Sequence, residues 1–141
     1  MQNEVVKGIL DFILGGDSNF TIYQEKPEFQ ARYRIVRSKD TKVYFIYTGE
    51  NKKSMKYQGY VTRDDLCNLK QGKNGLDKAH QDKRNLKALW WVMWHAENLP
   101  NVVHVLHNGR CSVCGKPLTD AISLSYGVGP TCRKRLENKQ K

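Results

Sequence analysis

The fold is decided by residues 19–62, which read NFTIYQEKPEFQARYRIVRSKDTKVYFIYTGENKKSMKYQGYVT. Runs rich in aromatic and β-branched residues occur in this stretch at positions 19–24, 31–37, 42–48 and 56–62. Such runs are typical of β-strands, and turn-forming residues such as Pro27 and Gly49 separate them. Because the links are short, the strands are expected to pair in an antiparallel meander. The sequence therefore predicts an antiparallel sheet of about four strands.

Helices are expected to flank this sheet, which makes the predicted fold α+β. Residues 5–14 repeat apolar side chains at helical spacing, and a short helix is expected at 63–69. Residues 79–99 form the longest predicted helix, which Pro100 ends. The apolar stripe of that helix consists of Leu86, Leu89, Trp90, Met93 and Ala96, widened by Trp91 and Trp94. One face of this helix is expected to cover the sheet.

Three of the four cysteines lie close to the C-terminus of the sequence. Cys111 and Cys114 have the C-x-x-C spacing with which two thiolates reach one metal ion from a tight turn. Cys132 follows Gly129-Pro130, a pair that favours a helix start and would place a thiolate in the first turn of that helix. Clustered cysteines in a reducing compartment are more often metal ligands than disulfides. We therefore predict a zinc site.

The fourth zinc ligand is predicted to be His107, which precedes Cys111 by four residues. His104 is the alternative, and a water, an acidic side chain or the absence of a metal remain open. A catalytic zinc of the deaminase kind needs a His-x-Glu and a Pro-Cys-x-x-Cys motif. No glutamate stands two residues after either histidine, and no proline precedes Cys111. The sequence therefore favours a structural zinc and a protein that is not an enzyme.

Residues 109–132 carry the pattern G-x-C-x-x-C-G-x-x-L-T-D-x-x-S-x-x-x-G-x-G-P-x-C. This pattern resembles a family of uncharacterised bacteriophage and actinobacterial domains with a presumed zinc-binding motif. The resemblance covers about residues 107–133. It implies that Cys111, Cys114 and Cys132 are metal ligands, and it implies no activity.

The formal net charge of +10 is concentrated in two parts of the chain. Residues 51–90 carry ten basic and four acidic side chains, and residues 108–141 carry seven and two, whereas residues 1–50 are balanced. This asymmetry predicts a partner that bears phosphates, DNA or RNA. The candidate nucleic-acid-binding residues are Lys52, Lys53, Lys56, Arg110, Lys116, Arg133, Lys134 and Arg135.

The expected organisation is a basic α+β domain at 1–101, followed by a zinc-binding module, or zinc knuckle, at 102–141. No apolar run is long enough for a membrane helix and no signal peptide is visible, so a cytoplasmic protein without a membrane partner is expected. The alternative function is a phage factor that binds and inhibits a host or defence protein. In that case the zinc would only hold together a scaffold for protein contacts.

Overall fold

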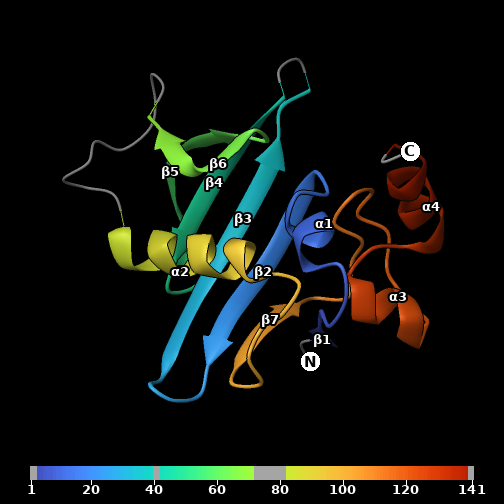
Figure 1. The fold of residues 1–141 in the computed structure, drawn as a ribbon, viewed down its shortest axis with the longest axis horizontal. Coiled ribbons are helices and arrows are strands. Elements are labelled where there is room, and N and C mark those ends of the chain that lie inside the picture. Colours follow the sequence, from blue (N-terminus) through green and yellow to red (C-terminus); the bar gives the residue numbers. More distant parts are fainter. Residues whose placement is uncertain (1–2, 40–41, 72–81, 140–141) are drawn as a thin grey trace.

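The protein is described by a computed structural model that covers residues 3–39, 42–71 and 82–139. The strands are β1 (Asn3–Glu4), β2 (Asp17–Gln24), β3 (Phe29–Arg37), β4 (Val43–Gly49), β5 (Lys56–Thr62), β6 (Asp65–Lys70) and β7 (Val103–His107). The helices are α1 (Ile9–Ile13), the 3₁₀ helix η1 (Lys52–Ser54), α2 (Lys83–Trp94), α3 (Ala121–Tyr126) and α4 (Pro130–Lys139). Figure 1 shows α2 lying across one face of the sheet, with α3 and α4 beyond α1 on the other side of the molecule.

The strands form one seven-stranded antiparallel sheet in the order β1-β7-β2-β3-β4-β5-β6. The four predicted strands correspond to β2, β3, β4 and β5, and their antiparallel meander is confirmed. The sheet has more strands than the predicted four or so, because β1, β6 and β7 also belong to it. The prediction of a helix at 63–69 is wrong, because Asp65 pairs with Thr62 across a tight turn and is the first residue of β6. Leu66 and Leu69 are three residues apart, a spacing that suits one face of a helix, and only pairing with the neighbouring strand β5 selects the extended form.

The two N-terminal elements also differ from the prediction. The backbone N–H of Val5 donates to the carbonyl of Val105 in β7, at 2.8 Å, so the chain is extended there and not helical. Gly8 has a φ of 64°, a left-handed conformation that separates this extended part from α1. As a result, the predicted helix 5–14 is reduced to Ile9–Ile13.

The hydrophobic core lies between the sheet and α2. Its side chains come from alternate positions of the central strands and from one stripe of the helix. They include Phe20, Ile22, Ala31, Tyr33, Ile35, Tyr44, Ile46 and Val61 of the sheet, and Leu86, Leu89, Val92 and Met93 of α2. The helix is tied to the sheet by polar contacts as well, since the Tyr33 hydroxyl donates to the Asn85 carbonyl at 2.7 Å.

The residues that were expected to widen the apolar stripe of α2 are not in the core. Trp91 is 41% exposed and Trp94 is 81% exposed, whereas Trp90 packs against the core. The helix ends at Trp94, six residues before Pro100, and begins at Lys83, preceded by Asp82, whose carboxylate caps it by accepting the Asn85 N–H. The first predicted helical residues, 79–81, lie outside the described residues.

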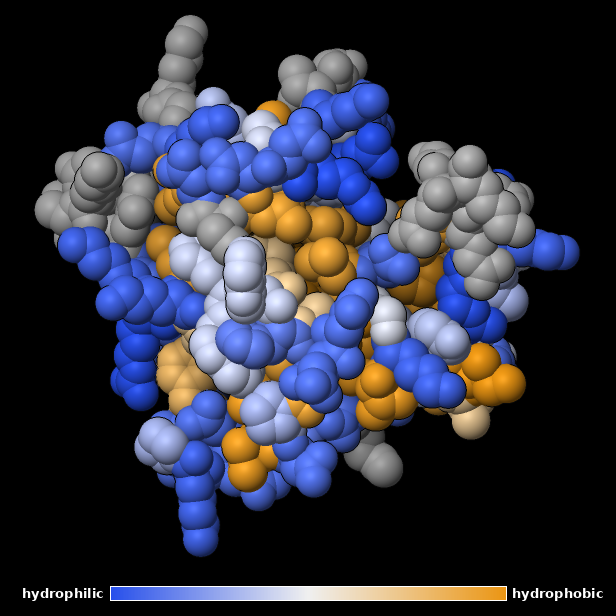
Figure 2. Space-filling view, viewed as in Figure 1, coloured by the Kyte–Doolittle hydropathy of each residue, from blue (hydrophilic) through white to orange (hydrophobic). Residues whose placement is uncertain are grey.

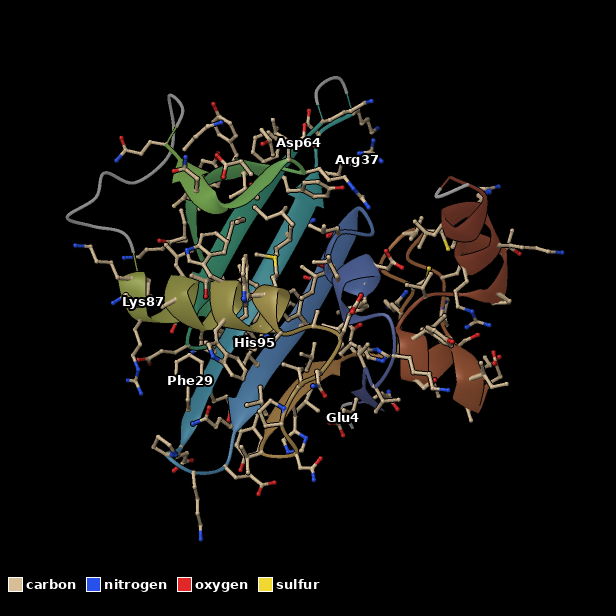
Figure 3. All side chains as sticks on the ribbon, viewed as in Figure 1. Glu4, Phe29, Arg37, Asp64, Lys87 and His95 are labelled. Atoms are coloured by element: carbon tan, nitrogen blue, oxygen red, sulfur yellow. The ribbon has the colours of Figure 1, made fainter. Side chains whose placement is uncertain are left out.

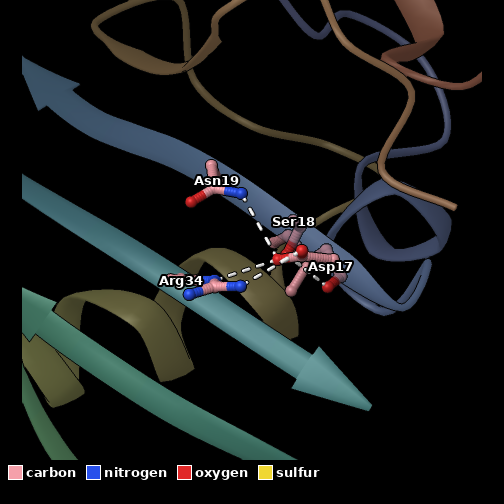
Figure 4. A network of polar contacts seen from close by, with 5 residues as sticks. Asp17, Ser18, Asn19 and Arg34 are labelled. Carbon is pink, nitrogen blue, oxygen red and sulfur yellow. Dashed lines mark hydrogen bonds and ion pairs between the residues drawn. The ribbon is translucent and has the colours of Figure 1, made fainter. Parts of the chain in front are cut away.

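The start of β2 is the junction between the sheet, α1 and the cysteine-bearing segment. The Ser18 hydroxyl donates to the carbonyl of Ile13 in α1, and the Asp17 N–H donates to the Ser112 carbonyl. The Asp17 carboxylate accepts two hydrogen bonds from Arg34 at 3.1 and 3.2 Å (Figure 4). Asp17 thus neutralises one of the arginines of β3 on the exposed surface.

Candidate metal centre

Cys111 and Cys114 lie on a tight backbone turn that follows β7. The Gly115 N–H donates to the Cys111 carbonyl at 2.9 Å, and the Cys111 N–H donates to the Lys116 carbonyl at the same distance. Gly115 has a φ of 77°, which favours glycine because a Cβ would be strained there. This turn directs both cysteine side chains to one side, as the C-x-x-C spacing predicts.

Cys132 reaches the turn because the chain reverses between α3 and α4. Asp120 begins α3 by accepting the Ser123 N–H at 3.0 Å, and Gly127 ends it with a φ of 66°. Pro130 is the first residue of α4, so Cys132 lies in the first turn of that helix as predicted. The positive end of the helix dipole there favours a thiolate.

The three thiols form a group that can hold a metal ion. The sulfurs of Cys111, Cys114 and Cys132 all lie within 4.8 Å of one another. Cys111 and Cys132 are buried, whereas Cys114 is exposed. The backbone N–H groups of Gly129 and Val113 donate to the Cys111 sulfur at 3.3 and 3.4 Å. These donors stabilise negative charge on sulfur, as a thiolate ligand requires.

The pKa values of the two buried thiols differ in direction. Burial opposes ionisation of Cys111, but the surrounding backbone N–H donors outweigh it and hold the pKa of Cys111 below its ordinary value. Burial, followed by the hydrogen bond and charge of the neighbouring thiols, raises the pKa of Cys132 to about 12. Three thiolates so close together repel one another, and a bound cation removes that penalty.

His107, the predicted fourth ligand, does not lie with the thiols. Its Nε2 is 2.8 Å from the Leu124 carbonyl, and its Nδ1 accepts the Gly109 N–H at 3.0 Å. The ring is therefore a neutral tautomer with its proton on Nε2, and burial lowers its pKa. Because both nitrogens bind backbone, the assignment of His107 as a ligand does not fit the structure. Instead, His107 joins β7 to α3.

The alternative ligand, His104, lies on the opposite face of β7. Its Nδ1 is 2.7 Å from a Glu4 carboxylate oxygen and its Nε2 is 3.2 Å from one of Glu25. The hydrogen bond with Glu4, reinforced by the charges of both carboxylates, raises the pKa of His104. Within the described part of the chain, the ligand group at the thiols contains no histidine and no carboxylate.

A cavity of about 340 Å³ adjoins the three thiols. Lys116, Asp120 and Arg135 are among the residues that line it. The cavity gives small molecules and solvent access to the sulfur cluster, and Lys116 and Arg135 place positive charge beside it. Two of the predicted basic residues are therefore close to the candidate metal centre.

The other predicted basic residues of this segment differ in how far their side chains are exposed and free to contact a ligand. Arg133 is partly buried and donates to the Ser123 hydroxyl at 3.1 Å and the Val128 carbonyl at 3.0 Å. Its guanidinium also lies 4.8 Å from the Tyr126 ring centroid. Arg133 therefore joins α3 to α4, whereas Lys134 is exposed on α4. Arg110 is exposed and donates to the Gly115 carbonyl at 3.2 Å.

The remaining predicted nucleic-acid-binding residues, three lysines of η1 and β5, do not lie near the metal centre. Lys52 and Lys53 are exposed on η1, and Lys56 is exposed at the start of β5. These lysines lie beside β4 and β5, which β2 and β3 separate from β7. The predicted nucleic-acid-binding residues thus form two separate surfaces.

The cysteine-bearing segment is similar to a known family of domains. Residues 103–137 match the model of a family of unknown function, DUF6011. This match covers β7, the cysteine turn, α3 and most of α4. No curated protein and no solved structure matches the chain. No helix in the described residues is long and apolar enough to cross a membrane.

Proposed function

We propose that the three thiols bind zinc. Thiolates are preferred zinc ligands, and a C-x-x-C turn with a third cysteine on a helix is a frequent arrangement in structural zinc sites. A cytoplasmic location fits this proposal, because thiols stay reduced there. With both nearby histidines bound elsewhere, the fourth ligand is solvent or a group outside the described residues.

The proposed role of the zinc is structural, and we propose no enzymatic activity. The metal would join the turn at Cys111 to the start of α4, beside the hydrogen bond from the Gly129 N–H to the Cys111 sulfur. Asp120 is a carboxylate beside the cavity, but it accepts the Ser123 N–H as the cap of α3. The position of Asp120 is therefore explained by its role as the cap of α3, without a role in catalysis.

Metal analysis of cysteine variants tests the zinc proposal. Purified Cys114→Ser and Cys132→Ser are expected to lose stoichiometric zinc, because each removes one of three ligands. Cys67→Ser is the matched control, since Cys67 lies in β6, at the sheet edge farthest in strand order from β7. Full zinc content in Cys114→Ser would contradict the ligand set.

We further propose that the protein binds nucleic acid through its basic surfaces. The observation that carries this proposal is the group of exposed cations around the cysteine turn: Arg110, Lys116, Lys134 and Arg135. In the described residues, ion pairs are formed by Arg34 and His104 and not by these cations. Cations that form no ion pair within the described part of the chain can neutralise phosphates.

Fluorescence anisotropy with labelled DNA and RNA oligonucleotides tests this function. Affinity is expected to fall steeply with salt, because phosphate contacts release counterions. Replacing Lys116, Lys134 and Arg135 with alanine should weaken binding and flatten the salt dependence, whereas Lys26→Ala, in the turn between β2 and β3, should have a much smaller effect. Absence of binding at low salt would refute the proposal.

The alternative, a factor that binds and inhibits a host or defence protein, is favoured by a different observation. Trp94 is 81% exposed, and tryptophans are enriched at the energetic centres of protein interfaces. Recovery of one stoichiometric protein partner after nuclease treatment would support this alternative. Loss of that partner on nuclease treatment would support nucleic-acid binding.

A further inference from the structure

The exposed face of α2 combines cations and aromatic rings at helical spacing. Arg84, Lys87, Trp91, Trp94 and His95 are all exposed, at positions separated by three or four residues or directly adjacent. We call this set the α2 stripe. Figure 3 labels Lys87 toward the N-terminal end of α2 and His95 toward its C-terminal end. The cations occupy the first half of the stripe and the rings the second.

The aromatic half of the stripe has no role in the core. The core contacts of α2 come from the opposite side of the helix, through residues such as Leu89 and Val92. Trp94 is nevertheless 81% exposed, and the Trp91 ring, 41% exposed, stacks on His95 with a centroid distance of 4.3 Å. Large aromatic surfaces in water are typical of binding sites. The stack holds a flat aromatic surface at the end of α2.

The basic half of the stripe is available for an anionic partner. Lys83 is also exposed there, and in the described residues none of the three cations forms an ion pair. The Arg84 guanidinium lies 5.2 Å from the Phe29 ring centroid, which orients it without neutralising it. The nearby Asp82 carboxylate caps the helix by accepting the Asn85 N–H. The charge at the N-terminal half of the stripe is therefore positive, whereas Trp94 shares a pocket with Arg63 and the acidic Asp11 and Glu97.

A hollow lies along the stripe, between α2 and the turn that joins β2 to β3. Its volume is about 350 Å³, and its lining includes Phe29, Arg84, Ala88, Trp91 and the acidic Glu28. This volume is at the small end of the range for ligand sites. Mostly apolar walls with a guanidinium at the rim suit a flat, partly polar ring attached to a phosphate. Figure 2 shows this face of the molecule, where hydrophilic side chains surround apolar patches.

We propose that the α2 stripe binds single-stranded nucleic acid. Bases stack on Trp91 and Trp94, and Arg84 and Lys87 contact the phosphates on either side. Bases are available for stacking only when they are unpaired, so the stripe selects single strands over duplexes. The choice of nucleic acid over an acidic peptide rests on the proposed function. The stripe adds a substrate class and a further surface, distinct from the cations around the cysteine turn and from the lysines of η1 and β5.

The experiment uses the full-length protein and two simultaneous signals. All three tryptophans of the sequence lie in α2, so intrinsic tryptophan fluorescence reports on this helix alone. Anisotropy of a fluorescein-labelled 15-nucleotide dT or rU strand reports overall binding, and a labelled hairpin duplex serves for comparison. Binding of the single strand is expected to quench the tryptophan emission. The duplex is expected to quench it much less.

Substitutions show whether the rings contribute to affinity. Trp91→Ala and Trp94→Ala are each expected to weaken single-strand binding about tenfold, since stacking of one base supports a loss of this size. Trp91→Phe and Trp94→Phe should retain most of the affinity, because they keep an aromatic face. Both tryptophans are exposed, so the variants are expected to unfold near the wild-type urea concentration, which circular dichroism verifies.

The outcomes separate this inference from the proposed function. If anisotropy rises but the tryptophan signal and the alanine variants are unaffected, the stripe is not a binding surface and the cysteine-turn cations remain the candidates. If no nucleic acid binds at low salt, both proposals are wrong. Quenching by a poly-glutamate peptide but not by oligonucleotides would overturn the assignment of nucleic acid and favour a protein partner.

Discussion

The contact between Gly127 and Phe12 gives a quantitative test of how the cysteine-bearing segment is attached to the sheet. Gly127 has a φ of 66°, and a Cβ added there would overlap the Phe12 ring, within 2.7 Å of its Cε1 atom. That ring is 1% exposed and is held by Phe20 and His107, at centroid distances of 5.8 and 5.5 Å. The ring therefore has little room to move.

Gly115 is the matched control for this substitution. Its φ of 77° carries a similar left-handed penalty, but a Cβ there would meet nothing within 4 Å. Gly115→Ala should therefore cost only the backbone penalty, about 1 kcal/mol. Gly127→Ala adds overpacking of about 1–3 kcal/mol, for a total of about 2–4 kcal/mol. The difference between the variants isolates the Phe12 contact.

The assay is urea unfolding in the presence of zinc, followed by circular dichroism, with metal content measured for both variants. For an m-value of about 2 kcal/mol per molar urea, Gly127→Ala should unfold about 0.5–1.5 M below Gly115→Ala. Equal midpoints would refute the reasoning, because they would mean that the ring yields freely. A separate early transition in Gly127→Ala would show that the segment unfolds independently of the sheet.

Three further predictions concern the polar contacts and the metal. Tyr33→Phe removes the buried hydrogen bond to the Asn85 carbonyl and should lower the free energy of unfolding by about 1 kcal/mol, measured by the urea midpoint. The pKa of His104 is raised above 6.5, chiefly by the hydrogen bond with Glu4 and then by Glu25. Protonated His104 therefore stabilises the folded protein fully when the pH is below the pKa of histidine in the unfolded chain. This stabilisation is lost as the pH rises through the pKa of His104 in the folded protein. His104→Gln should therefore destabilise the protein more at pH 6 than at pH 9, and an equal loss at both pH values in unfolding curves would contradict this. Chelation of the metal should lower the thermal midpoint, with recovery on addition of zinc but not of magnesium.

The central strands and the cysteine turn were predictable because their signals are local. A run such as 43–48 consists entirely of β-branched and aromatic side chains, which favour a strand whatever lies around it. The spacing of Cys111 and Cys114 likewise allows only a tight turn to bring both sulfurs to one ion. Both features depend on backbone geometry within a few residues, so the chain itself carries the information.

The fourth ligand was not predictable, because nearness in sequence does not determine where a side chain points. His107 precedes Cys111 by only four residues, yet its position in β7 directs the ring toward Phe12 and Leu124. The signal that could have excluded it is the following Asn108-Gly109 pair, where a turn presents a backbone N–H to the ring. The sequence also did not predict the exposure of Trp94. The predicted helix continued to residue 99, whereas α2 ends at Trp94 and leaves that side chain outside the core.

The sequence by itself determined the elements: the antiparallel strands of 19–62, the helix that covers them and three cysteines at metal-binding spacing. Only the tertiary structure decided how these elements meet. It made β6 a strand by pairing it with β5, directed both ring nitrogens of His107 to the backbone and separated the basic residues into distinct surfaces. The physical reason is that strand pairing, burial and side-chain direction depend on neighbours distant in sequence. Local propensity and spacing therefore predict the parts, and packing selects which surfaces are free to bind.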